Sequence, residues 1–109
     1  MGWKIVRDND EAVCRAMGIS GQWRPSVTPI PGLTRKVFEE AAEFAEGNDP
    51  GELYDLRDVL DELIRRLDPA GEAAETHQVK VAKRGAFTFC LEWTPVPGEL
   101  PGESGDAGS

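Results

Sequence analysis

Apolar residues recur at helical spacing along residues 51–67. The side chains that form this stripe lie mostly three or four positions apart: Leu53, Leu56, Val59, Leu60, Leu63, Ile64 and Leu67. A period near 3.6 residues predicts an amphipathic helix. Asp49, Pro50 and Glu52 precede or open the segment, which is the expected combination of a capping side chain, a proline at the first helical position and an early acid. The helix is predicted to end at about residue 67.

Capping residues predict three more helices. Asp8 or Asp10 begins one that runs to about residue 17, and Thr34 begins another that runs to about residue 46. A last helix covers roughly residues 70–83, with Gly85 suited to its C-terminal cap. Residues 18–32 contain three prolines and no helical period, which predicts a long loop. Such a loop is either a functional cover or a plain surface crossing.

Two segments have the composition of strands. Residues 3–6 (WKIV) are bulky and β-branched, and residues 86–93 (AFTFCLEW) place Phe87, Phe89 and Leu91 on one face. The expected fold is therefore mainly α, a helical bundle of about four helices with a small antiparallel β ribbon made by these two strands. Residues 1–94 form one predicted domain, and residues 95–109, rich in Pro, Gly and Ser, form a predicted flexible tail.

Composition restricts the classes of partner. The chain has 20 acidic and 12 basic residues and a net charge of −8, which argues against binding a nucleic-acid backbone. It contains no apolar run of about 20 residues, and its first ten residues do not form a signal peptide, so a cytoplasmic protein without membrane contact is expected. Cys14 and Cys90 show no metal-binding or disulfide spacing.

The acids of residues 36–46 gather on one side of their predicted helix. Lys36, Glu39, Glu40 and Glu43 share that side, and the apolar residues lie opposite. This arrangement alone is ordinary for an amphipathic helix whose acidic face is solvated and whose apolar face turns inward.

The next helix changes that interpretation. Glu52 falls inside the apolar stripe and Asp55 lies at its edge. A buried carboxylate is costly unless it is paired, neutralised or bound to a metal, although the helix dipole also favours an acid in the first turn. Two helices joined by a short turn pack antiparallel, so Glu40 and Glu43 are expected to meet Glu52 and Asp55. Four carboxylates around one point favour Mg²⁺, or Mn²⁺, with phosphate oxygens as further ligands.

These stretches resemble one known family. KVFEEAAEF followed by ELYD is similar to the EExxE and ExxD signature of the all-α nucleoside triphosphate pyrophosphohydrolases, the MazG and phosphoribosyl-ATP pyrophosphohydrolase-like superfamily. KIVRD at residues 4–8 and VKVAKRGAF at residues 79–87 resemble the KLVRD and KxxKRGGF motifs of one branch of it. The matches extend from residue 4 to about residue 93.

The resemblance implies hydrolysis of a nucleoside triphosphate, or a related nucleotide, to the monophosphate and pyrophosphate. It assigns the metal ligands to Glu40, Glu43, Glu52 and Asp55. It also implies that Glu39 orients or deprotonates the attacking water and that Lys36 contacts phosphate. Family members are oligomeric, so a homodimer or homotetramer is expected.

Several cations and one aromatic residue are further candidates for substrate binding. The candidates to hold the phosphate tail are Lys4, Arg7, Lys80, Lys83 and Arg84. The last three would equally complement the dipole of the helix that they end. Trp23, in the proline-rich loop, would stack on a base or serve in ordinary packing. Two other functions stay open: a metal or nucleotide sensor without turnover, and a helical interaction module whose acidic faces are solvated.

Overall fold

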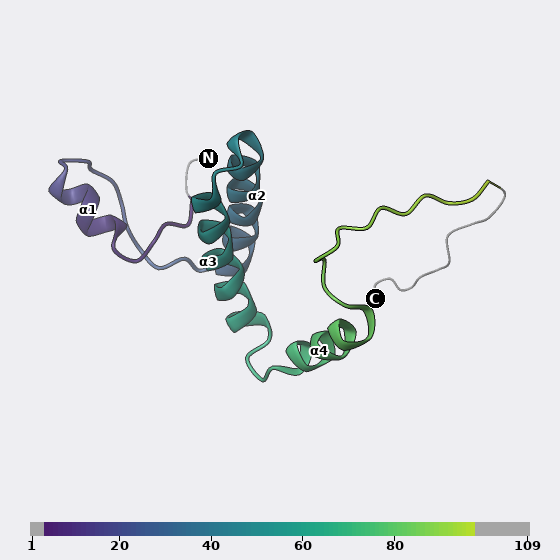
Figure 1. Cartoon of the computed structure of the whole chain (residues 1–109). Helices are drawn as coiled ribbons and strands as arrows, with labels where there is room; N and C mark the ends of the chain where they lie inside the picture. The colour runs from purple at the N-terminus through teal and green to yellow at the C-terminus, as the bar shows by residue number, and fades with distance from the viewer. Residues whose placement is uncertain (1–3, 98–109) are drawn as a thin grey trace. The chain divides into compact units, whose positions relative to one another are not determined.

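The chain is mainly helical, as predicted (Figure 1). A computed structural model describes residues 4–97, which contain four helices: α1 (Asp10–Ala16), α2 (Pro29–Gly47), α3 (Pro50–Leu67) and α4 (Glu72–Arg84). The chain divides into two compact units, residues 1–69 and 70–109. Most of the predicted tail, residues 98–109, lies outside the described residues, as does Trp3 of the predicted first strand.

Helices α2 and α3 form a hairpin that organises the first unit. Asn48 ends α2 in the left-handed conformation (φ 54°), and its N–H donates to the carbonyl of Phe44. Asp49 then caps α3, because its side chain accepts a hydrogen bond from the Gly51 N–H at 3.0 Å, as the sequence predicted. Only Asn48 and Asp49 link the two helices, and so short a link makes them run antiparallel. Figure 1 shows the two helices side by side.

Helix α2 begins earlier than the capping residues predicted. It starts at Pro29, with Thr28 as the preceding residue, so Thr34 is not a cap. Instead the Thr34 hydroxyl lies inside the helix and donates to the carbonyl of Ile30 at 2.9 Å. Pro29 and Pro31 were interpreted as loop residues, yet prolines fit the first turn of a helix, where their missing N–H has no intrahelical partner.

The predicted β ribbon is wrong for the described part of the chain. Residues 4–97 contain no strand. Cys90 has a positive φ of 48°, and its N–H donates to the carbonyl of Phe87 at 3.1 Å. This turn interrupts the extended backbone that the alternation of Phe87, Phe89 and Leu91 predicted, and all three side chains are exposed.

The apolar core of the first unit is thin. Among the described residues, Leu33 is the one large apolar side chain that is buried, at 7% exposure. Phe38, one of the apolar residues of α2 that were expected to face inward, is instead 72% exposed, whereas Glu40 on the acidic side of the helix is buried. In the α3 stripe, Leu56 and Val59 are partly covered and Ile64 is exposed. The hairpin therefore turns part of its acidic side, rather than its whole apolar side, toward its own interior.

No helix within residues 4–97 has the length and apolar character needed to cross a membrane.

Candidate metal centre

Three carboxylates from the two paired helices meet near the closed end of the hairpin. Glu40 comes from the second half of α2, and Glu52 and Asp55 come from the first half of α3. One oxygen from each lies within 4.8 Å of the others. The spacing within each helix and the short link after Asn48 produce this convergence, as the sequence predicted for these three residues. We call Glu40, Glu52 and Asp55 the carboxylate cluster.

Two oxygens of the cluster are buried without a partner. Glu40 is only 8% exposed, and its Oε1 has no hydrogen-bond donor within reach. The same holds for Oε1 of Glu52. Buried polar atoms in folded proteins are nearly always hydrogen-bonded, because each orphan typically costs about 1–3 kcal/mol. These two oxygens therefore have free acceptor capacity, and a metal cation is one ligand that such carboxylate oxygens bind.

The fourth predicted ligand, Glu43, faces Glu52. Partial burial raises the pKa of the Glu52 carboxyl above its ordinary value of 4.5, and Glu43 is the next contributor, through its charge and a side-chain hydrogen bond. Asp55 and Glu40 raise that pKa further. The electrostatic repulsion at Glu52 thus comes from the three other acids that the sequence assigned to the metal.

Lys36 and Glu39 border the cluster on α2. The Nζ of Lys36 lies 3.3 Å from Oε1 of Glu39 and 3.5 Å from Oε2 of Glu40. Burial acts to lower the pKa of Lys36, but the two glutamates outweigh it and the pKa is raised. Lys36 therefore stays protonated and neutralises one side of Glu40, while the other oxygen of Glu40 is the orphan.

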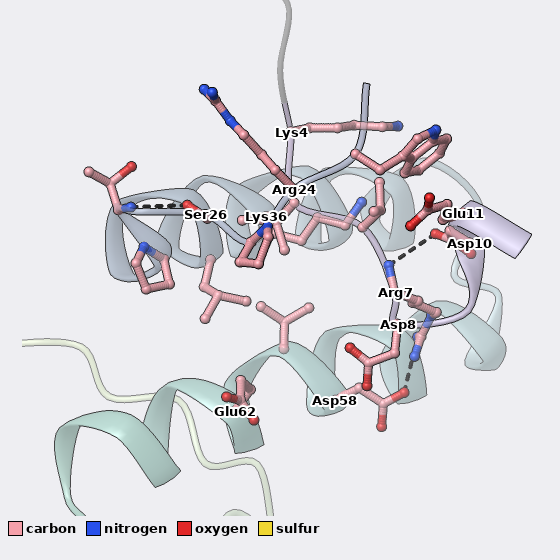
Figure 2. A pocket seen from close by; sticks show the side chains of 18 of the residues that line it. Lys4, Arg7, Asp8, Asp10, Glu11, Arg24, Ser26, Lys36, Asp58 and Glu62 are labelled. Atoms are coloured by element: carbon pink, nitrogen blue, oxygen red, sulfur yellow. Dashed lines mark hydrogen bonds and ion pairs between the residues drawn. The ribbon is translucent and has the colours of Figure 1, made fainter. Parts of the chain in front are cut away.

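Arg7 connects the N-terminal segment to α3. Its guanidinium donates to Oδ1 of Asp55 at 2.9 Å and lies 3.0 Å from Oδ2 of Asp58. Figure 2 shows Arg7 extending from this segment toward Asp58, with Lys36 on the neighbouring helix. A residue proposed from the resemblance to contact phosphate is thus joined directly to a member of the cluster.

An open cleft of about 1150 Å³ lies beside the cluster (Figure 2). It is lined by residues 4–8, 10 and 11, by the proline-rich segment 22–29, and by α2 and α3. Glu40 and Asp55 are part of the lining. Trp23 also lies in its wall, as a base-stacking residue would require. The basic side chains that line the cleft are Lys4, Arg7, Arg24, Lys36 and Arg66. Acids and cations thus face one space that can receive a metal-bound polyanion.

The remaining predicted substrate residues belong to the second unit. Lys80, Lys83 and Arg84 lie on the last half of α4, and all three are exposed. Lys83 and Arg84 occupy the last turn of α4, where they also complement the helix dipole. Their contact with phosphate stays a prediction.

The sequence did not single out three residues that the structure places at the cleft. Arg24 and Arg66 contribute charge to its lining, and Asp58 shares Arg7 with Asp55. Arg24 directly follows Trp23, and Asp58 follows Asp55 by three positions, so each neighbours a residue that was singled out.

Comparison with protein-family models, with curated proteins and with solved structures gave no match for this chain.

Proposed function

We propose that the protein is a Mg²⁺-dependent hydrolase that converts a nucleoside triphosphate, or a related nucleotide, to the monophosphate and pyrophosphate. The observation that carries the proposal is the pair of buried, unpartnered oxygens on Glu40 and Glu52 inside the carboxylate cluster. Hard oxygen ligands of this type suit Mg²⁺, which keeps some of its waters and takes phosphate oxygens as further ligands. Mn²⁺ is a second candidate for the same ligands.

The side chains of the site have separate roles in this proposal. Glu40, Glu52 and Asp55 hold the metal, and Glu43 joins them from its place beside Glu52. When bound, Mg²⁺ supplies Lewis acidity at a phosphate oxygen and lowers the pKa of a bound water. Glu39, less buried than Glu40, orients the attacking water or takes its proton.

The reaction breaks the anhydride between the α and β phosphates. The water oxygen forms a bond to one of the two phosphorus atoms of this anhydride, and the bond from that phosphorus to the bridging oxygen breaks. The bridging oxygen leaves with the bonding electron pair, and the water releases one proton. Lys36 is protonated and lies at the cleft wall, so it is placed to contact a phosphate oxygen. Lys4 and Arg7 supply further positive charge in the cleft, which offsets the charge of the leaving pyrophosphate. Trp23 supports the nucleotide part of the substrate by stacking on the base.

A homodimer or homotetramer completes the proposal. The hairpin leaves Phe38, Leu53, Ile64 and Leu67 exposed. Each fully buried side chain of this size is worth about 1.5–3 kcal/mol, and the single chain gains little of it. Association of identical hairpins through these faces supplies the missing core.

The test is a product assay. The protein is incubated with a panel of canonical and modified nucleoside triphosphates and Mg²⁺, and pyrophosphate and orthophosphate are measured separately. Pyrophosphate in equal amount to monophosphate is expected from at least one substrate, with at least a 100-fold loss in the Glu40→Gln variant, since a metal ligand is removed. Absence of product from every substrate, or orthophosphate as the main product, would contradict the proposal.

A further inference from the structure

The backbone of Arg7 is fixed by hydrogen bonds that are separate from the contact of its side chain with the carboxylate cluster. Its backbone N–H donates to Oδ2 of Asp10 at 3.0 Å, and the Asp10 N–H donates to the Arg7 carbonyl at 3.1 Å. These reciprocal hydrogen bonds fix the backbone of Arg7 at the start of α1. The guanidinium then spans to α3, 48 positions away in sequence, where it bonds Asp55.

The Arg7 guanidinium contacts two acids, one inside the carboxylate cluster and one outside it. Asp55 belongs to the cluster, whereas Asp58, one turn further along α3, does not. A carboxylate that accepts one hydrogen bond from Arg7 on Oδ1 keeps further lone pairs for a metal ion. Carboxylates that bind metals are commonly held in this way by an outer hydrogen bond, which restricts their rotation before the metal arrives.

We propose that Arg7 is a positioning residue for the metal site: it holds the Asp55 carboxylate in the orientation in which one oxygen faces Glu40 and Glu52. The proposal rests on the metal role given to the cluster above and adds a residue that acts through Asp55 rather than on the metal. Arg7 has donor groups beyond the one that bonds Asp55, so it can hold Asp55 and still meet a phosphate oxygen.

Mn²⁺ binding to the full-length chain tests this role without any substrate. Free Mn²⁺ is measured by electron paramagnetic resonance during titration of the wild type, Arg7→Ala, Arg7→Lys, Asp58→Ala and Arg15→Ala. Asp58→Ala removes one partner of the guanidinium and leaves the Asp55 bond. Arg15 is the matched control because it pairs with Glu11 within α1.

Arg7→Ala is expected to weaken Mn²⁺ binding by roughly 10- to 100-fold, the usual effect of losing an outer partner of a metal ligand. Arg7→Lys should recover part of that loss, since a lysine keeps the charge without the planar fork. Asp58→Ala and Arg15→Ala should bind as the wild type does.

Three outcomes would overturn the positioning role. Equal or tighter binding by Arg7→Ala would show that the guanidinium is irrelevant to the metal or competes with it. An equal loss in Arg7→Ala and Asp58→Ala would show that Arg7 only anchors the N-terminal segment. A wild type that binds no Mn²⁺ would overturn this role together with the proposed function, whereas the first two outcomes leave the proposed function standing.

Discussion

Glu52 and Glu62 lie ten positions apart on the same helix and have opposite surroundings. Glu62 accepts hydrogen bonds from Arg65 and Arg66, and these cations lower its pKa to about 2. Glu52 has an orphaned oxygen, and its partial burial among other acids raises its pKa. Glu62 is paired by arginines of its own helix and needs no further partner. Glu52 is surrounded by acids, so the partner that we propose for it is a cation from outside the chain.

The contrast also separates two uses of acidic residues in a chain of charge −8. Around Glu62 the charges follow helical spacing, three and four positions apart, and each has a partner on the same helix. Around Glu52 the charges come from two helices and repel. Only the second arrangement costs folding energy in the absence of a ligand, so we propose a binding site at Glu52 and none at Glu62.

The largest expected difference between the two glutamates is in the response to metal. At Mg²⁺ equal to 100 times its dissociation constant, the wild type should gain about 2.7 kcal/mol of unfolding free energy. For a domain of this size that is a rise in melting temperature of roughly 10 to 20 °C. Glu52→Gln should lose most of the rise and Glu62→Gln should keep it. Equal responses from both variants, measured by thermal denaturation, would break the comparison.

In the absence of metal, the contributions of the two glutamates to folding stability should also depend on pH in opposite directions. Glu52 binds its proton more tightly in the folded state, so its contribution to stability falls as pH rises from about its ordinary 4.5 through the raised folded value. Glu62 behaves conversely: its stabilising contribution is present above 4.5 and is lost as pH falls toward about 2.

Urea denaturation midpoints measured in a chelator between pH 2 and 8 separate these effects. Glu52→Gln should flatten the curve above pH 4.5, and Glu62→Gln should flatten it below that value. A wild-type curve that rises steadily above pH 4.5 and is unchanged by Glu52→Gln would show that Glu52 is not under electrostatic strain.

The smallest expected effect is the loss of the Glu62 ion pairs at neutral pH. Glu62→Gln keeps the shape of the side chain and removes a charge that is open to solvent, where ion pairs are screened. A melting temperature within a few degrees of the wild type is expected, well below the response to metal. A larger drop, together with loss of helical circular dichroism, would mean that the Glu62 pairs hold α3 together.

Much of the fold was predictable from local chemistry. Asp49, Pro50 and Glu52 mark the start of α3 because a cap, a first-turn proline and an early acid act within one turn of the chain. The convergence of Glu40 with Glu52 was predictable for the same reason, since two helices joined by a short link must run antiparallel. Each of these features depends on residues close in sequence.

Features set by distant residues were not predictable. The pairing of Arg7 with Asp55 joins positions 48 apart, and no spacing rule specifies it. The burial of Glu40 and the exposure of Phe38 depend on which segment packs against each side of α2. A helical wheel gives the direction of each side chain but does not show which side is covered. Residues 86–93 alternate as a strand does, but alternation alone supplies no partner strand, and the turn at Cys90 ends the extended backbone.

The most direct test of the central claim measures the pyrophosphate and monophosphate formed from a nucleoside triphosphate with Mg²⁺. The wild type, Glu40→Gln and Glu62→Gln are compared. The predicted result is pyrophosphate and monophosphate in equal amounts from the wild type and from Glu62→Gln, with the same loss in Glu40→Gln as stated above. Product formation by Glu40→Gln at the wild-type rate, or none from the wild type on any nucleotide, would contradict a catalytic metal site at the carboxylate cluster.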